Sequence, residues 1–327
     1  MFAIATPAKQ SAEDTIATLS GRLSSATLLE DRRAAVLGLK SFASSFPATV
    51  SSNALRGLIS CLDRDSQDVE TSQATLQTLL QLFNPDETSP EASEDIALWL
   101  ADEFTQRQDN ITLLLDLLDA QEFYSKLYSL KLLAEILSSR VERTKECIGT
   151  APLGISKLVA VLDDTRDAIR NEGLSLLIYL TQNSTELQKR VVFEDAFERI
   201  FSIIRNEGSL SHGDRIVEDC LILLSNLLRL NEQNQTLFRE TGFVPRAAKL
   251  LSDAVHEYQD GGLDLSEWAL TQMNRNVYAL LAVLRLFLVD GGVSRQANQL
   301  SFWQHGVLEQ ALKLSFNHYA QPLIQAE

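Results

Sequence analysis

Carboxylates gather at one point of this 327-residue chain, in the segment FEDAFER, which holds Glu194, Asp195 and Glu198. Acidic side chains so close together attract basic groups, so the segment is a candidate docking patch for a basic partner. Asp and Glu are also favoured in the first turn of a helix, where they interact with the positive end of the helix dipole. The sequence leaves both interpretations open.

Asn226, in the apolar run LLSNLL, is a second candidate partner contact, because a side-chain amide can hydrogen-bond a peptide backbone. Catalytic candidates are missing: the chain has no G-x-x-x-x-G-K-[ST], G-x-G-x-x-G, G-x-S-x-G or H-E-x-x-H. The four histidines are isolated from one another and from the cysteines, which argues against a zinc site. One of them, His212 in SLSHGD, is predicted to lie in a loop. We therefore expect no enzyme, no cofactor and no metal.

The formal net charge of −15 excludes several classes of partner. Nucleic-acid binding requires a basic stripe that displaces counterions from phosphates, and an acidic protein is repelled by anionic lipid surfaces. A basic or apolar protein partner fits the charge better. The odd count of three widely spaced cysteines indicates free thiols in a reducing compartment.

The N-terminal segment lacks the basic start and apolar run of a signal peptide. No stretch approaches 18 apolar residues without a polar break, so we expect no membrane-spanning helix.

The elements that must position these residues form a repeat. Apolar residues recur at i, i+3, i+4 and i+7, the pattern of one helix face. Strong copies are Leu55/Leu58/Ile59/Leu62, Ile111/Leu114/Leu115/Leu118, Ile155/Leu158/Val159/Leu162, Phe197/Ile200/Phe201/Ile204 and Val244/Ala247/Ala248/Leu251. Weaker copies are Ile16/Leu19/Ser20/Leu23 and Val307/Gln310/Ala311/Leu314.

The last members of these stripes are 39, 56, 44, 42, 47 and 63 residues apart. Armadillo and HEAT repeats have periods of about 40–47 residues. Each of the two long spacings contains a polar insertion that we expect to be a loop. These are residues 84–95 (NPDETSPEASED) and 252–268.

Two further helices accompany each stripe. A strongly apolar helix follows it, with Leu132 and Leu176 at equivalent places, as expected for a helix between neighbours. Asn-rich turns open a short helix before it (NSTELQKRVVFED, NEQNQTLFRETG and NQLSFWQHG), and Gly242 and Gly306 suit left-handed C-terminal caps. Three helices per unit predict an all-α, armadillo-like right-handed α-solenoid, with residues 1–327 as a single repeat domain.

Armadillo proteins that bind extended peptides pair a groove-lining Asn with a Trp one turn earlier. Here Ile222 stands one turn before Asn226, the comparable place in the preceding repeat holds Ile178, and the three tryptophans lie elsewhere. The missing Trp argues against a nuclear-import adaptor.

Residues 167–241 carry a more specific resemblance. DAIRNEGLSLLIYLT, LQKRVVFEDAFERIFSII and IVEDCLILLSNLLRLNEQNQTLFRE resemble the globular head of the general vesicular transport factors, the Uso-type tethers acting between endoplasmic reticulum and Golgi. Residues 1–150 and 245–327 match the family in their repeat architecture more than in their individual residues.

The resemblance implies a non-enzymatic head that binds a Rab-family GTPase, golgins and SNARE-associated proteins. It implies a cytoplasmic protein peripherally associated with Golgi and vesicle membranes through its partners, and homodimerisation through a coiled coil beyond Glu327. It would make this chain a fragment of such a head. The alternatives are another armadillo scaffold, such as a chaperone nucleotide-exchange factor or a formin regulatory domain, and an enzyme with an unusual site. An enzyme would need a cleft of strongly perturbed titratable groups.

Overall fold

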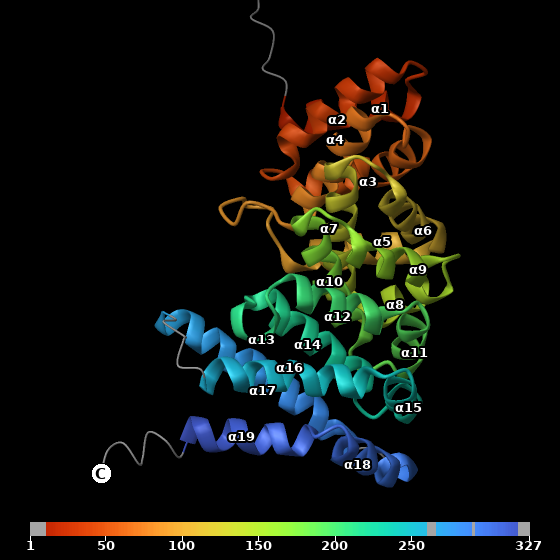
Figure 1. Cartoon of the computed structure of the whole chain (residues 1–327). Helices are drawn as coiled ribbons and strands as arrows, with labels where there is room; N and C mark the ends of the chain where they lie inside the picture. The colour runs from red at the N-terminus through yellow and green to blue at the C-terminus, as the bar shows by residue number, and fades with distance from the viewer. Residues whose placement is uncertain (1–10, 260–265, 290–291, 320–327) are drawn as a thin grey trace, which may run out of the picture. The chain divides into compact units, whose positions relative to one another are not determined.

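The computed structural model describes residues 11–259, 266–289 and 292–319 of the chain. These residues fall into two compact units that divide between Leu158 and Val159 (Figure 1). Each unit is a stack of helices, and the described ranges contain no strand. The all-α prediction is confirmed, whereas a single domain over residues 1–327 stays a prediction.

Unit one begins with two helix pairs, and its later helices differ widely in length. Its elements are α1 (Ala12–Ser25), α2 (Leu29–Ala43), α3 (Pro47–Arg64), α4 (Val69–Phe83), α5 (Glu94–Gln106), α6 (Gln108–Asp116), η1 (Leu117–Asp119), α7 (Phe123–Ser139), α8 (Val141–Thr150) and α9 (Gly154–Ala160), whose last residues pass into unit two.

Unit two contains the segment of densest resemblance. Its elements are η2 (Val161–Asp163), α10 (Asp167–Thr181), α11 (Thr185–Phe193), α12 (Ala196–Asn206), α13 (Ser209–His212), α14 (Arg215–Leu228), α15 (Glu232–Glu240), α16 (Phe243–Gln259), α17 (Glu267–Val289), η3 (Gly292–Ser294), α18 (Arg295–Gln304) and α19 (Val307–Tyr319).

The three-helix repeat is present in both units, but not at the N-terminal end. In unit two, α11, α12 and α14 follow the predicted order of short, stripe-bearing and apolar helix. In unit one, α5, α6 and α7 take these three places, but α5 has 13 residues and is longer than α6, which has 9. The pairs α1–α2 and α3–α4 lack the short first helix. Only Ser44–Phe46 separate α2 from α3, and Pro47 starts α3 at once because its fixed φ suits the first helical position.

The apolar stripes form the core, as predicted. All members of the five strong stripes are buried, and the third helices bury Leu132 and Leu176 completely. Each such leucine contributes roughly 1.5–3 kcal/mol by leaving water. Third helices pack on one another within each unit, α4 against α7 in unit one and α10 against α14 in unit two.

Left-handed turns join the short and stripe-bearing helices of unit two. Gly242 (φ 82°) and Gly306 (φ 69°) adopt this conformation, which confirms the predicted caps. Asp195 holds the equivalent place between α11 and α12 with φ 60°. Asn231 caps the N-terminus of α15, as the Asn-rich turn predicted. The third Asn-rich segment, NQLSFWQHG, does not open a helix as predicted. Its first residue, Asn298, lies inside α18, which begins at Arg295.

Two loop predictions are wrong in part. His212 ends the short helix α13, and α16 continues through the second polar insertion to Gln259. The rest of that insertion up to residue 265 lies outside the described residues.

No single helix among the described residues is long and apolar enough to cross a membrane. The helix α17 together with Gly292–Gln304 passes the same test of length and composition as a pair bent by 97°. Met273, Leu280 and Phe287 of α17 are nevertheless buried in unit two, as expected of a core helix.

Candidate functional site

The turn between α11 and α12 carries the predicted acidic patch. Glu194 is the C-cap residue of α11 and the left-handed Asp195 precedes α12, so two residues connect the helices. Phe193, the last residue of α11, is 85% exposed, which is unusual for so large an apolar side chain. Arg199 donates to the Glu194 carbonyl and, at 2.7 Å, to the Asp163 carboxylate. The Glu194 and Asp195 side chains and the Phe193 ring therefore remain available at the turn.

Glu198 has a different role. Its carboxylate accepts two hydrogen bonds from Arg246 of α16, at 2.5 and 3.0 Å. The hydrogen bonds from Arg246 lower the pKa of Glu198 below its ordinary value. The Arg246 guanidinium also lies 5.0 Å from the ring centre of Phe201 and 4.7 Å from that of Phe243, in cation–π range. Glu198 thus joins two successive repeats, as the helix-turn interpretation allowed.

Asn226 lies on α14, half-buried against α10. Its side-chain amide donates to the Ile178 carbonyl at 3.0 Å, so it bridges two successive third helices. A cavity of about 490 Å³ opens beside it. Its lining is polar apart from Leu230 and consists of Gln182, Asn183, Thr185, Gln188, Asn226, Arg229 and Leu230.

Two left-handed residues, Asn183 (φ 55°) and Leu230 (φ 52°), border this cavity from the turns that follow α10 and α14. Leu230 is 72% exposed. Its left-handed backbone is unfavourable for a leucine.

The amide nitrogens of Asn226 and Gln188 already donate to the Ile178 and Thr181 carbonyls. An added peptide backbone would therefore have to use exposed side chains of the lining, such as Asn183 and Arg229. Asn226 stays a predicted partner contact, and its neighbours in the cavity were not among the predicted residues.

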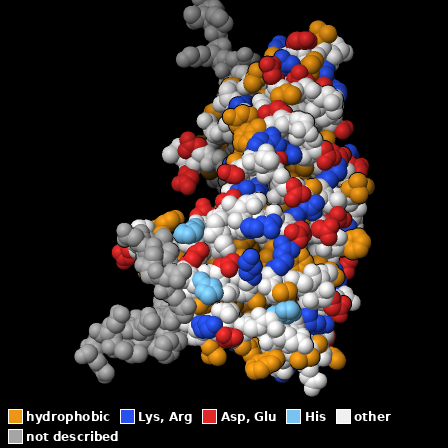
Figure 2. All heavy atoms as spheres, in the orientation of Figure 1, with side chains coloured by type: hydrophobic (Ala, Val, Ile, Leu, Met, Phe, Trp, Pro, Cys, Tyr) orange, Lys and Arg blue, Asp and Glu red, His pale blue; other side chains and the backbone are white. Residues whose placement is uncertain are grey.

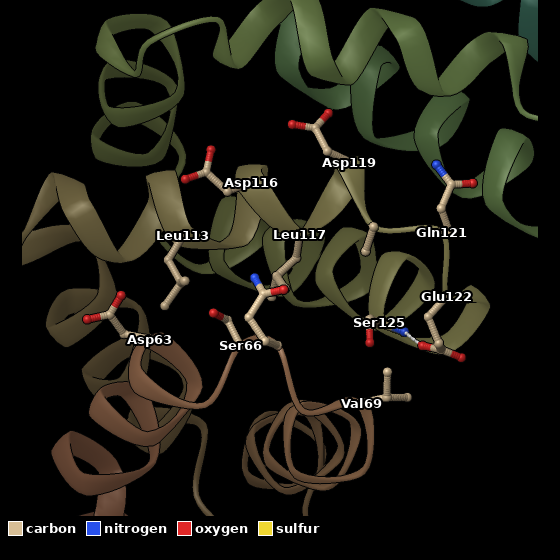
Figure 3. A pocket seen from close by; sticks show the side chains of 12 residues that line it. Asp63, Ser66, Val69, Leu113, Asp116, Leu117, Asp119, Gln121, Glu122 and Ser125 are labelled. Carbon is tan, nitrogen blue, oxygen red and sulfur yellow. Dashed lines mark hydrogen bonds between the residues drawn. The ribbon is translucent and has the colours of Figure 1, made fainter.

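A larger cavity, about 640 Å³, lies in unit one between the α3–α4 turn and the η1–α7 turn (Figure 3). Four of its twelve lining residues carry carboxylates. Asp63 comes from the last turn of α3, Asp116 ends α6, Asp119 ends η1, and Glu122 precedes α7. Figure 3 shows Asp116 and Asp119 projecting from the same helical segment.

Two of these carboxylates are paired with a lysine. Lys157 Nζ lies 2.6 Å from Asp116 and 2.8 Å from Asp119. Burial acts to lower the pKa of Lys157, but the two carboxylates outweigh it and raise that pKa. Glu122 caps α7 by accepting from the backbone of Tyr124 and Ser125. One lysine facing four acids leaves the cavity negative, so it favours a cationic group.

The sequence carries one signal for this cavity. The stripes end in Leu-Asp pairs, Leu62-Asp63 and Leu118-Asp119, and these aspartates lie at opposite sides of the cavity. The repeat pattern places an aspartate directly after the last core leucine of each of these stripes. It does not indicate that the two aspartates line the same cavity.

Metal and thiol chemistry find no support. In the described residues, no group of three His, Cys, Asp or Glu could hold a metal ion. The three cysteines are unpaired, and burial raises the pKa of Cys61 to about 11. Burial also raises the pKa values of Cys147 and Cys220, which disfavours the reactive thiolate.

The fold and these non-catalytic surfaces define a helical-repeat protein of the armadillo class. A computationally designed armadillo repeat protein for peptide recognition matches 81% of this chain and 99% of its own length, with a TM-score of 0.59. At 15% identity this likeness concerns the fold alone.

More specific relatives are transport factors. The intracellular transport protein uso1 of Schizosaccharomyces pombe is 43% identical over 260 residues, 80% of this chain. The general vesicular transport factor p115 of Homo sapiens is 35% identical over 91% of the chain. A crystal structure of Uso1 covers 97% of the chain with a TM-score of 0.85 and 33% identity. No family model matches.

The chain is therefore a homologue of the Uso1 and p115 vesicular transport factors, and the resemblance found in residues 167–241 is confirmed. It spans 24% of the length of the fission-yeast relative, 31% of the human one and 49% of the crystallised Uso1 chain. The relatives are named for transport and not for catalysis, in agreement with a non-enzymatic protein.

Proposed function

We propose that the chain is part of the head of a vesicle tether and acts as a protein scaffold in endoplasmic reticulum-to-Golgi and intra-Golgi transport. The observation that supports this most is the 43% identity to the uso1 transport protein over 260 residues. In this proposal it binds a Rab-family GTPase, golgins and SNARE-associated proteins. It works in the cytoplasm, peripherally on Golgi and vesicle membranes, and a coiled coil outside this chain makes the whole protein a homodimer.

Three surfaces are the proposed contacts. The turn formed by Phe193, Glu194 and Asp195 offers an apolar side chain beside two carboxylates. The negative cavity around Asp63 accepts a Lys or Arg side chain of a partner. The amide-lined cavity beside Asn226 accepts an extended segment. Glu198 is left out, because its carboxylate is already paired with Arg246.

The experiment is a binding titration of the immobilised chain with Rab-family GTPases of the early secretory pathway, each loaded with GTP or GDP. We expect binding that prefers the GTP form. A Glu194→Lys change should weaken it at least about tenfold if the turn is the contact, since like charges across an interface cost several kcal/mol. Asp63→Asn tests the cavity in the same way.

Glu186→Lys is the matched control, because Glu186 is an exposed acid at the opposite end of α11. It should leave the affinity almost unchanged. Equal binding of both nucleotide states, or of no Rab protein at all, would contradict the proposed GTPase partner. Binding unaffected by both Glu194→Lys and Asp63→Asn would refute these surfaces while leaving the tether role standing.

A further inference from the structure

The connection between α4 and α5, residues 84–93, is the first polar insertion that the repeat spacing revealed. It carries Asp86, Glu87 and Glu91, and Figure 1 shows it as a loop standing out from the helices of unit one. By contrast, a single residue, Arg140, separates α7 from α8. The loop is therefore additional to what the helical repeat needs.

Specific hydrogen bonds fasten the loop to the corner between α2 and α3. The Asp86 amide donates to the Ser44 carbonyl at 3.1 Å. The Ser89 hydroxyl donates to the Ser45 carbonyl at 2.7 Å and accepts from the Glu91 amide at 3.1 Å. Ser89 is thus the central attachment, because its one hydroxyl joins both sides.

Glu91 completes the attachment by capping α3 from a distance. Its carboxylate accepts from the Thr49 amide at 2.9 Å and from the Thr49 hydroxyl at 2.6 Å. Phe46, at the N-cap position of α3, has no side chain that could do this. An acceptor at the N-terminus satisfies one of the free amide groups of the helix. Holding the loop in place and capping α3 are therefore one event.

Ser89 is followed by Pro90, and the one other Ser or Thr before a proline in the sequence is Thr6, which lies outside the described residues. Proline-directed protein kinases require this pair as their acceptor. Thr88 and Pro90 are exposed and Ser89 is half-buried, so a small local opening presents the hydroxyl.

We propose that Ser89 is a phosphorylation site of a proline-directed, ATP-dependent protein kinase, and that its modification releases the loop from the α2–α3 corner. Ser89 Oγ attacks the γ-phosphorus of ATP, a new Oγ–P bond forms, and the bond from that phosphorus to the bridging oxygen of ADP breaks. The hydroxyl proton passes to the base of the kinase.

Release follows from two consequences of that bond. The ester oxygen has no proton left to donate to Ser45, so the central attachment is lost. The phosphate adds a charge of about −1.5 to −2. That charge lies beside Asp86, Glu87 and Glu91, and like-charge repulsion favours departure of the loop. Once Glu91 leaves, the first turn of α3 is uncapped.

The test treats the full chain with a purified MAP kinase and ATP, maps phosphate by peptide mass spectrometry, and follows amide hydrogen exchange. Thr6→Ala in every variant removes the other Thr-Pro acceptor. We then expect phosphate at Ser89 and exchange of the Thr49 amide faster by roughly fivefold, the equivalent of a lost cap. Pro90→Ala should strongly reduce labelling while keeping the hydroxyl. Thr88→Ala, one residue earlier and not followed by proline, should be labelled like the parent chain.

Two results would overturn the proposal. One is the absence of phosphate at Ser89 with both a MAP kinase and a cyclin-dependent kinase. The other is a fully phosphorylated chain in which the Thr49 amide exchanges at its original rate, because the phosphate would then leave the loop in place.

Discussion

At the scale of single residues, the buried carboxylate of Asp65 shows how firmly one repeat can be joined to the next. Arg32 donates to it twice, at 2.7 and 2.5 Å, and both side chains are less than a tenth exposed. Cys61 adds a thiol contact at 3.3 Å. Each charge of the Arg32–Asp65 pair is compensated by the other. Removing one partner leaves the other charge buried without a counterion, which lowers the free energy of unfolding.

We expect Asp65→Asn to lower the free energy of unfolding at pH 7 by about 3–5 kcal/mol, since it leaves the Arg32 charge buried without a counterion. Asp63→Asn, two residues earlier and exposed, should change it by less than about 0.5 kcal/mol. Urea unfolding of the two variants and the parent chain measures both effects.

The stability difference between the parent chain and Asp65→Asn should depend on pH. The hydrogen bond from Arg32 lowers the pKa of Asp65 below its ordinary value. The ionised carboxylate therefore stabilises the fold fully above the unfolded pKa of about 3.9, and this contribution is lost as the pH falls through the lower folded pKa. The stability gap between the parent chain and Asp65→Asn should shrink below about pH 4. A gap that stays constant would show that Asp65 does not act through its charge.

At the scale of the elements, the turns before α12, α16 and α19 have the same left-handed backbone conformation but different residues. Gly242 and Gly306 adopt the conformation without strain, whereas Asp195 holds it with a side chain. A Cβ added at Gly242 would meet no atom within 4 Å, so any cost of adding one comes from the backbone alone.

We therefore expect one substitution to have opposite signs at two glycines. Gly242→Ala should destabilise the chain by about 1–2 kcal/mol, because an L-residue is unfavourable at φ 82°. Gly21→Ala, inside α1 and equally free of nearby atoms, should stabilise it by about 0.5–1 kcal/mol through helix propensity. Thermal unfolding of both variants decides the matter, and equal signs would contradict the backbone explanation.

The elements also mark where prediction from sequence succeeds. Residues such as Leu58 and Ile200 were placed in the core because helix periodicity depends only on near neighbours. The partner of Glu198 is Arg246 and the residue that caps α3 is Glu91, both more than 40 positions away along the chain. Such pairs depend on how repeats stack, and a single sequence carries no signal for them. For the same reason, the sequence shows that Glu194, Asp195 and Glu198 lie close together, but it does not show that Glu198 alone of the three pairs with Arg246.

At the scale of the whole molecule, the net charge of −15 is the balance of 44 acidic and 29 basic residues. Figure 2 shows acidic and basic side chains interspersed on the visible face. Many of them pair across repeats, as Arg56 does with Glu103 and Arg140 with Asp102. The stability of the fold therefore comes from the leucine-rich interiors of the two units more than from the excess acid.

Because the chain divides into two compact units, we expect damage to the core of one unit to stay within that unit. Leu176 of α10 is fully buried in unit two, and Leu176→Ala should cost about 2–5 kcal/mol through lost burial and the cavity left behind. Repeats contact mainly their neighbours, so hydrogen exchange should accelerate within residues 159–230 while residues 15–60 keep their protection. Tyr179→Ala, on the exposed side of the same helix, is the control and should leave both regions nearly unchanged. If exchange rose equally in both regions, the chain would unfold as one cooperative body, and neither the repeat nor the unit boundary would limit how far a core defect spreads.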